Sequence, residues 1–327
     1  MRKRYDQESS DLLRGQDCQI TLDVYAPPAT LKSIPREIVL YQYENCPFCC
    51  KVKAFLDFHK LPYRCVEVNP LTKSELKWSA YRKVPVATLD GEQYNDSNVI
   101  IGVLDAVLAG THRARAERSG GASTASSWWF SAPKPSAGPS GRLPQTGPSP
   151  GAEAAGENLV SGLSSQPAAP EGPAAVERAW RRWVDEWFVR VLTVNIYRTS
   201  REAWQTFDYI TEHGNFSWWQ RTAARVSGSG IMYAVSRRLR TRYGVQGDVR
   251  EALFAAADDW CDALGESRFL AGNERPGTAD IAMFGVLRSV VGTDSFNDVM
   301  QQTRLGKWYE AMFAQVGDSA RLADARP

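Results

Sequence analysis

Cys46 and Cys49, separated by two residues, are the side chains in this chain best suited to chemistry. Residues 38–41 before them are apolar and largely β-branched, which predicts a buried strand, and the residues after them repeat apolar positions at helical spacing. Pro47 suits the first helical position, where a missing N–H costs nothing. Cys46 would then cap the helix, whose unpaired N–H groups and dipole stabilise a thiolate. The motif predicts a redox or glutathione site.

The alternative for this pair is two buried structural cysteines, but the proline and the strand-to-helix junction favour a working thiol. Cys50 falls on the next helix face and is expected to pack or to act as an auxiliary thiol. The remaining cysteines are expected to be inert small hydrophobic residues: Cys18, Cys65 and Cys261. The sequence excludes a zinc site, because it has no second Cys-x-x-Cys pair and only three histidines.

Length and composition place the chain among ordinary globular proteins. It has 327 residues, enough for two domains, with 43% hydrophobic and 23% charged residues. The net charge of +2 is too small to indicate a nucleic-acid partner. The cysteine pattern fits a reducing compartment rather than a secreted disulfide framework.

Hydropathy gives no run of 18 apolar residues, so no membrane span is expected. The first residues carry early acidic side chains and no apolar core, which is typical of neither a secretory signal nor a transit peptide. A cytoplasmic location is therefore expected, with an organellar or peripheral membrane location as the alternative.

Residues 36–110 alternate between strand and helix patterns. Asp90 and Gly91 separate two short strand-like runs, and this dipeptide favours a hairpin turn. The last helix is expected to stop at Gly110, because glycine commonly ends a helix. The expected elements are strand 38–43, helix 47–60, strand 63–68, strand-like runs 83–91 and 92–95, and helix 97–110. This order, with Cys-x-x-Cys after the first strand, is the thioredoxin-like pattern.

The rest of the chain divides by composition. Residues 1–35 read as an irregular N-terminal segment, and 111–173 as a low-complexity linker rich in Ala, Gly, Pro and Ser that cannot bury enough apolar surface to order itself. Residues 174–327 are expected to be all helical. The expected helices are 175–192, 201–212, 216–242, 248–264, 278–292 and 305–315.

Three short motifs carry a resemblance to known families. They are Cys46-Pro47-Phe48-Cys49, Lys83-Val84-Pro85 before a strand and Asn95-Asp96-Ser97 before a helix. In these motifs the chain resembles glutaredoxins and the N-terminal domain of glutathione transferases. The helix start Pro276-Gly-Thr-Ala-Asp280 resembles the all-α transferase domain, with Asp280 as a capping residue rather than a catalytic one.

Longer stretches resemble the type 2 prostaglandin E synthase family, over roughly 36–110 and 176–316. They include Tyr41-Gln-Tyr43, Tyr81-Arg-Lys-Val-Pro85, Asn195-Ile-Tyr-Arg-Thr199 and Ala282-Met-Phe-Gly-Val-Leu-Arg288. The resemblance implies an α/β thioredoxin-like N-terminal domain plus an all-α glutathione-transferase-like C-terminal domain, with the active site in the cleft between them.

The same resemblance implies glutathione as a cofactor and haem as a second ligand of that cleft. Carried over position by position, the catalytic residues are Tyr43, Cys46 and Cys49, and the glutathione contacts are Val84, Asp96 and Ser97. Arg238 and Arg242 match arginines near the haem carboxylates. Thr193 stands where the family has an active-site serine, and Arg190 where it has a histidine.

The residues themselves leave alternatives for these assignments. Pro85 could simply start a strand, but a cis peptide is expected, since it would present the backbone of Val84 to a ligand. Asp96 and Ser97 could only cap a helix, or could cap and also bind a carboxylate and an ammonium. Tyr43 could pack, or could donate its O–H to the thiolate or substrate.

Two features of the helical half have a structural alternative too. Arg238 and Arg242 are four residues apart and share one helix side, so they form either a solvated face or an anion site. Trp180, Trp183 and Trp187 are expected to be core rather than to line a cleft.

These observations predict a glutathione-dependent thiol enzyme in which Cys46 is the thiolate, Cys49 resolves or supports it and Tyr43 donates a hydrogen bond. By resemblance the reaction is the isomerisation of a prostaglandin endoperoxide, so the partner is a small electrophilic or peroxidic lipid. The alternatives are a glutaredoxin-like thiol-disulfide oxidoreductase, or a carrier or sensor that binds haem and glutathione without turnover. A homodimer and a peripheral membrane contact are compatible with each of these.

Overall fold

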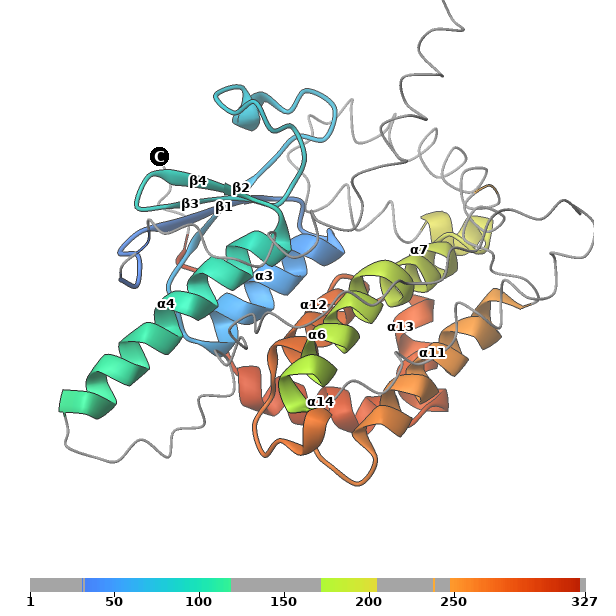
Figure 1. Ribbon diagram of the computed structural model, residues 1–327. Helices are drawn as coiled ribbons and strands as arrows, with labels where there is room; N and C mark the ends of the chain where they lie inside the picture. The colour runs from blue at the N-terminus through green and yellow to red at the C-terminus, as the bar shows by residue number, and fades with distance from the viewer. Residues whose placement is uncertain (1–30, 32, 119–171, 205–237, 239–247, 324–327) are drawn as a thin grey trace, which may run out of the picture. The chain divides into compact units, whose positions relative to one another are not determined.

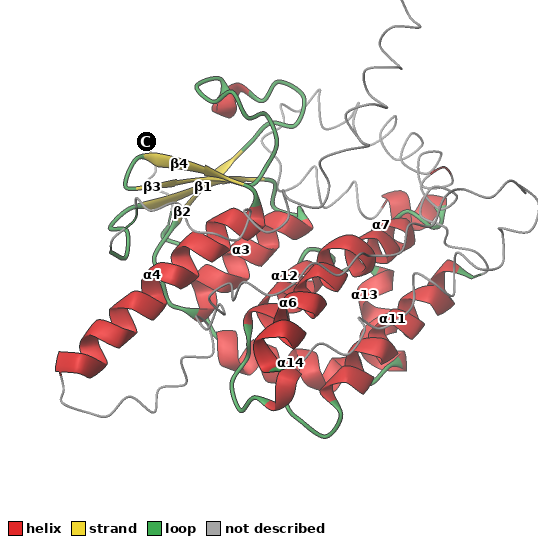
Figure 2. Ribbon diagram, in the orientation of Figure 1, coloured by secondary structure: helices red, strands yellow, loops and turns green. Residues whose placement is uncertain are grey.

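The computed structural model describes residues 31, 33–118, 172–204, 238 and 248–323. The chain forms two compact units, Met1–Ser123 with Asp318–Pro327, and Thr124–Gly317. In the described residues, the first unit is a four-stranded sheet with two α-helices and a short 3-10 helix, and the second is helical (Figures 1 and 2). The helical domain predicted over 174–327 ends earlier than expected, because the structure groups residues from Asp318 onward with the first unit.

The first unit has the expected order of strands and helices. Its elements are β1 (Ile38–Gln42), α3 (Pro47–Phe58), β2 (Arg64–Glu67), the short 3-10 helix η1 (Ser74–Leu76), β3 (Val86–Leu89), β4 (Glu92–Asn95) and α4 (Ser97–Arg118). The sheet order is β2-β1-β3-β4, with β1 parallel to β2 and antiparallel to β3. This is the thioredoxin-like arrangement, and it places the end of β1 directly before the start of α3.

The hairpin between β3 and β4 confirms the turn predicted at Asp90-Gly91. Leu89 pairs with Glu92, so the loop has two residues. Their φ angles are 50° and 88°, the positive values that a type I′ turn requires and that Asp-Gly tolerates. Asp90 Oδ1 also accepts hydrogen bonds from the backbone N–H groups of Arg36 and Glu37, at 2.8 and 2.9 Å, which fixes the chain entering β1.

The predicted stop of the last helix at Gly110 is wrong, because α4 continues to Arg118. A glycine inside a helix costs only about 1 kcal/mol relative to alanine. The residues after it include alanine, arginine and glutamate, which favour helix. Thr111 meanwhile satisfies its hydroxyl by donating to the backbone oxygen of Val107 at 2.9 Å.

Within residues 172–204 and 248–317, the second unit consists of helices joined by short connections. They are α6 (Pro173–Trp183), the π-helical segment η2 (Val184–Phe188), α7 (Val189–Ile196), α11 (Val249–Leu264), the 3-10 helix η4 (Leu270–Gly272), α12 (Thr278–Arg288), α13 (Asp294–Gln302) and α14 (Leu305–Val316). The predicted helices at 248–264, 278–292 and 305–315 are confirmed, although α12 ends before 292. Of those predicted at 201–212 and 216–242, only residues 201–204 and 238 are described, and they are helical.

Two features of the second unit differ from the prediction. The single helix expected over 175–192 is a longer run interrupted by the π-helical turn η2. The helix α13 was not predicted, because its sequence is mostly polar. Its start does carry a recognisable cap, since Thr293 Oγ1 accepts from the N–H of Phe296 at 3.2 Å.

Tryptophans form the centre of the second unit, as predicted. The ring centroids of Trp180 and Trp183 lie 5.0 Å apart, and Trp260 lies 5.5 Å from Trp180 and 5.3 Å from Trp308. Trp308 also donates its Nε1–H to Asp280 Oδ1 at 3.1 Å.

Asp280 is a capping residue, as expected. Its Oδ2 accepts from the backbone N–H of Gly277 at 3.0 Å at the start of α12. Burial raises the pKa of its carboxyl to about 6, against the effect of these hydrogen bonds. Asp280 also accepts from the backbone N–H of Leu270, at 3.3 and 3.2 Å, so it joins η4, the start of α12 and the tryptophan core.

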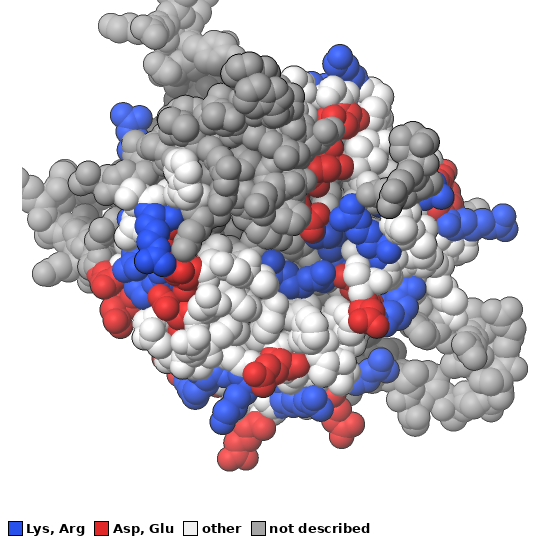
Figure 3. Space-filling view, turned by 180° about the vertical axis from the view of Figure 1, so that it is seen from behind, with Lys and Arg blue, Asp and Glu red and all other residues white. Residues whose placement is uncertain are grey.

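The described part of the chain gives two further general observations. None of its helices combines the length and the hydropathy needed to cross a bilayer. On the described part of the face in Figure 3, basic and acidic side chains are interspersed rather than separated by sign.

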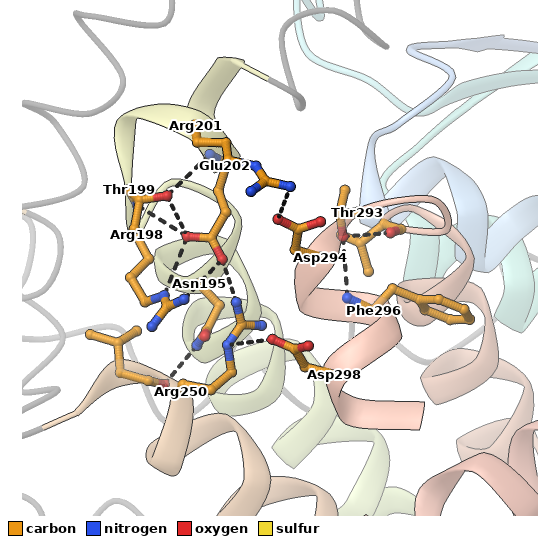
Figure 4. A network of polar contacts seen from close by, with 12 residues as sticks. Asn195, Arg198, Thr199, Arg201, Glu202, Arg250, Thr293, Asp294, Phe296 and Asp298 are labelled. Atoms are coloured by element: carbon orange, nitrogen blue, oxygen red, sulfur yellow. Dashed lines mark hydrogen bonds and ion pairs between the residues drawn. The ribbon is translucent and has the colours of Figure 1, made fainter. Parts of the chain in front are cut away.

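A buried ion-pair network joins three helical segments of the second unit (Figure 4). Glu202 is almost fully buried and accepts hydrogen bonds from the guanidinium groups of Arg250 and Arg198. Arg250 Nε also lies 3.5 Å from Asp298 on α13. Asn195 Nδ2 donates to the backbone oxygen of Val249 at 2.8 Å, which fixes the end of α7 against the start of α11.

We expect Glu202→Ala to lower the free energy of unfolding by about 3–5 kcal/mol, because it leaves the charge of Arg250 buried without its main partner. Arg201→Ala is the matched control. Its side chain is exposed and lies 3.7 Å from Asp294, so its loss should cost less than about 1 kcal/mol. Urea unfolding of both variants measures the difference, and equal losses would contradict a structural role for the buried pair.

Candidate thiol site

The backbone on both sides of Cys46 holds its thiol at the N-terminus of α3. Cys46 is the N-cap residue, with φ −73° and ψ 120°, and Pro47 is the first helical residue, as predicted. The N–H of Cys46 donates to the backbone oxygen of Tyr43 at 3.0 Å, and its own oxygen accepts from the N–H of Cys50 at 2.9 Å. Cys46 is half-buried as a residue, whereas Cys49 is buried.

The two cysteines of the motif have opposite acidities. A hydrogen bond with the Cys49 thiol lowers the pKa of Cys46, and the N–H groups of Cys49 and Phe48 and the charge of Lys53 add to this effect against burial. Burial and the neighbouring Cys46 raise the pKa of Cys49 well above its ordinary value. The motif therefore favours loss of the proton from Cys46 over loss of the proton from Cys49.

The other cysteines are buried, as expected for packing residues. Cys50 is buried and donates its thiol to the backbone oxygen of Glu44 at 3.3 Å. Burial raises the pKa of Cys65 to about 12 and that of Cys261 to about 11, so both stay protonated. Cys18 lies outside the described residues.

Tyr43 and Val84 are brought together on one apolar cluster of the first unit. The cluster consists of Val68, Leu76 and Val86, and the half-buried side chains packed against it are Tyr41, Tyr43, Tyr81 and Val84. Burial, and secondarily the charges of Cys46 and Cys49, raise the pKa of Tyr43. Its phenol therefore keeps its proton and can donate a hydrogen bond. The predicted cis peptide between Val84 and Pro85 is also confirmed.

Asp96 begins α4 and has an exposed side chain. Its Oδ1 accepts from the N–H of Asn98 at 2.8 Å, so its capping role is confirmed. Its φ of 73° is uncommon for a residue other than glycine, and such conformations cluster at functional sites. Ser97, the first helical residue, is buried. Because Asp96 is exposed, a cation can reach its carboxylate while the cap is kept.

Tyr81 and Lys51 were not among the predicted site residues. Tyr81 packs on the same apolar cluster as Tyr43 and Val84, and burial, followed by the charges of Asp96 and Cys46, raises the pKa of its phenol. The sequence signal that could have indicated Tyr81 is its place four residues before Pro85, in the segment that leads to the predicted glutathione contact Val84. Lys51 is fully buried and donates to Asn98 Oδ1 at 3.0 Å, which ties α3 to the start of α4.

The other predicted site residues belong to the second unit. Thr193 is half-buried on α7 and donates its hydroxyl to the backbone oxygen of Val189 at 2.7 Å, a common arrangement for threonine in a helix. Arg238 is exposed, and Arg242 lies outside the described residues.

Comparison with known proteins gives a family for the first unit. Residues 40–111 match the family described as glutathione S-transferase, N-terminal domain. A glutaredoxin 2 from Salmonella typhimurium, solved in complex with glutathione, is 14% identical, with 85% of this chain and 94% of that chain covered and a TM-score of 0.37.

Two relatives match over most of the chain. Prostaglandin E synthase 2 from Danio rerio is 38% identical over 291 residues, which are 84% of this chain and 70% of that protein. Prostaglandin E synthase 2 from Mus musculus is 34% identical over 308 residues, which are 89% of this chain and 73% of that protein. The chain therefore belongs to the prostaglandin E synthase 2 family.

Proposed function

We propose that this protein is a glutathione-dependent thiol enzyme whose nucleophile is Cys46. The observation that carries the proposal is the pairing at the start of α3 of a half-buried N-cap cysteine of lowered pKa with a buried cysteine of raised pKa. A thiolate is the reactive form of cysteine, and a nearby protonated thiol stabilises it by donating a hydrogen bond.

Glutathione would bind along the first unit beside this thiolate. The N-terminus of α4 suits the carboxylate of the γ-glutamyl end, and the exposed carboxylate of Asp96 suits its ammonium. The backbone of Val84 would pair with the peptide backbone, as the family resemblance implies. Tyr81, which feels the charges of both Asp96 and Cys46, would lie beside the bound tripeptide.

For the substrate we propose a lipid endoperoxide, which is the class that the family resemblance implies. The thiolate of Cys46 attacks one peroxide oxygen, so that an S–O bond forms and the O–O bond breaks. The other oxygen leaves as an alkoxide and takes a proton, for which the phenol of Tyr43 is the donor. The Tyr43 phenolate left by that transfer takes the C–H proton beside the sulfur-bound oxygen, so that the C=O bond of a ketone forms, the S–O bond breaks and its electron pair returns to sulfur. The sum is an isomerisation, and glutathione keeps Cys46 reduced.

A second candidate is a glutaredoxin-like reaction, which the hydrogen bond between the two thiols favours. Here the Cys46 thiolate attacks a disulfide, one substrate thiol leaves, and Cys49 attacks the mixed disulfide to release the other. Haem forms no part of either proposal, since Arg238 is exposed and Arg242 lies outside the described residues.

We expect the rate of Cys46 alkylation by iodoacetamide to level off at a pH below the roughly 8.5 of a free cysteine, because the reactive form is the thiolate. Cys49 and Cys50 should react later, since both are buried. Peptide mapping by mass spectrometry between about pH 5 and pH 9 measures the alkylation rate of each cysteine on both sides of the pKa of a free thiol. Earlier modification of Cys49 or Cys50 would show that the nucleophile is misassigned.

We expect Cys46→Ser to abolish both endoperoxide isomerisation and disulfide reduction. Cys49→Ser separates the two candidate functions, because only the dithiol route uses that residue as a reactant. In a single turnover with a disulfide and no glutathione, the variant should release one thiol and stop at a mixed disulfide with Cys46. If it retains endoperoxide turnover, isomerisation needs one cysteine, and if it loses both reactions, the first candidate is contradicted.

We expect Asp96→Asn to weaken glutathione binding by about tenfold to a hundredfold, since a charge-assisted hydrogen bond is worth about 1.5–3 kcal/mol. Asparagine caps helices as well as aspartate and tolerates a positive φ, so the helix start is kept. Glu92→Gln is the control, because it removes one negative charge from an exposed residue of β4. Calorimetry measures the affinity for glutathione. If both variants bind glutathione as tightly as the parent protein, Asp96 is not a glutathione contact.

A further inference from the structure

We propose that the C-terminal segment, residues 318–322, holds the Cys46 loop in its reactive arrangement, with Arg321 as a positioning residue. The inference rests on the proposed role of Cys46 as the nucleophile. It concerns a part of the chain that follows the last helix and that the sequence alone connects with no site.

The C-terminal segment lies along the free edge of β2. The N–H of Leu322 donates to the backbone oxygen of Tyr63 at 2.8 Å, and the N–H of Tyr63 donates to Ala320 at 3.4 Å. Tyr63 and Arg321 form a parallel bridge. Because β2 is the outer strand of the sheet, the segment extends the sheet where it would otherwise end.

A buried carboxylate of α3 anchors the segment. Asp57 is 1% exposed, and its Oδ1 accepts from Ser319 Oγ at 2.8 Å, from the N–H of Ala320 at 2.9 Å and from the hydroxyl of Tyr63 at 3.1 Å. Lys60 Nζ also donates to the backbone oxygen of Asp318 at 3.0 Å. These contacts fix the position from which Arg321 extends.

Arg321 reaches the loop that carries the nucleophile. Its Nη1 lies 3.4 Å from Oε2 of Glu44, two residues before Cys46. Glu44 also receives hydrogen bonds from Gln42 at 2.6 Å and Lys53 at 2.7 Å. Burial opposes ionisation of Glu44, but Lys53, Gln42 and Arg321 together hold the pKa of its carboxyl below its usual value. Arg321 thus completes the set of cationic and amide donors around this carboxylate.

Glu44 connects Arg321 with the surroundings of the Cys46 thiol through its backbone and through Lys53. The backbone N–H of Glu44 donates to Glu67 Oε1 at 2.9 Å, and its backbone oxygen accepts from Lys53 Nζ at 3.2 Å. Lys53 is nearly fully buried, and its charge is one of the causes that lower the pKa of Cys46. A Glu44 side chain left without Arg321 would draw Lys53 toward itself and loosen the loop, so that the Cys46 thiolate is less well stabilised.

The test is the pH profile of Cys46 alkylation by iodoacetamide in the full chain. Arg321→Ser should slow alkylation at pH 7 by about twofold to fivefold, the range that a partly exposed ion pair supports. Arg321→Lys, which keeps the charge, should recover most of the rate. Arg64→Ser is the matched control, because that exposed arginine on β2 lies 3.7 Å from Glu37 instead, and its profile should equal the parent profile.

A double variant distinguishes positioning from a general loss of stability. In a Glu44→Gln background Arg321→Ser should have no further effect on the alkylation profile, since the ion pair is already absent. An Arg321→Ser profile equal to that of the parent protein overturns the proposal, whatever happens to the melting temperature, and so does an undiminished effect in the Glu44→Gln background. If Cys46 of the parent protein is not the first residue modified, the proposed function itself fails, and this inference fails with it.

Discussion

The site depends on one constraint: the sulfur of Cys46 has to lie at the N-terminus of α3, where the helix dipole is positive. The backbone contacts between β1 and α3 hold Cys46 at this position. A helix N-terminus offers unpaired N–H groups only within its first turn, so a displaced cysteine loses their effect. Cys46 is therefore fixed through its own backbone, by Tyr43 before it and Cys50 after it. The parallel pairing of β1 with β2 in turn fixes where β1 ends. The register of β1 and β2 therefore helps to set the position of Cys46 at the helix start, and through that position it affects the pKa of the thiol.

The helix that carries the thiol buries three charged side chains, and each one ties it to a different element. Lys51 reaches Asn98 at the start of α4, Lys53 reaches Glu44 in the loop before Cys46, and Asp57 reaches the C-terminal segment. Buried charges are costly unless they are paired and hydrogen-bonded. Because each pairing demands a specific position for its partner, the three together define how α3 sits in its unit.

The sequence predicted the parts of the site that depend on local rules. Proline after Cys46 and Asp-Gly in the hairpin each act within a few residues, and the structure confirms the cap and the turn. The buried charges of α3 could not be predicted in this way, since periodicity treats a lysine as a surface residue. Their partners, such as Glu44 and Ser319, come from distant or irregular segments. The same limit explains α13, whose polar sequence hides a helix held by its cap and its packing.

The raised pKa of Cys49 is compatible with a later role as a reactant, because its causes change during a reaction. Burial, the largest cause, remains, but the next two are the hydrogen bond with Cys46 and the negative charge of its thiolate form. When Cys46 enters a mixed disulfide, its negative charge disappears, and both causes disappear with it. Cys49 then becomes more acidic at the step at which it would have to attack. Before any reaction the same two causes make Cys49 the less acidic thiol of the pair, so that it favours ionisation of Cys46 and does not compete with it. In the dithiol route, Cys49 can therefore first donate a hydrogen bond while Cys46 is the nucleophile. Afterwards Cys49 can attack the sulfur of Cys46 in the mixed disulfide, and the remaining substrate thiol leaves.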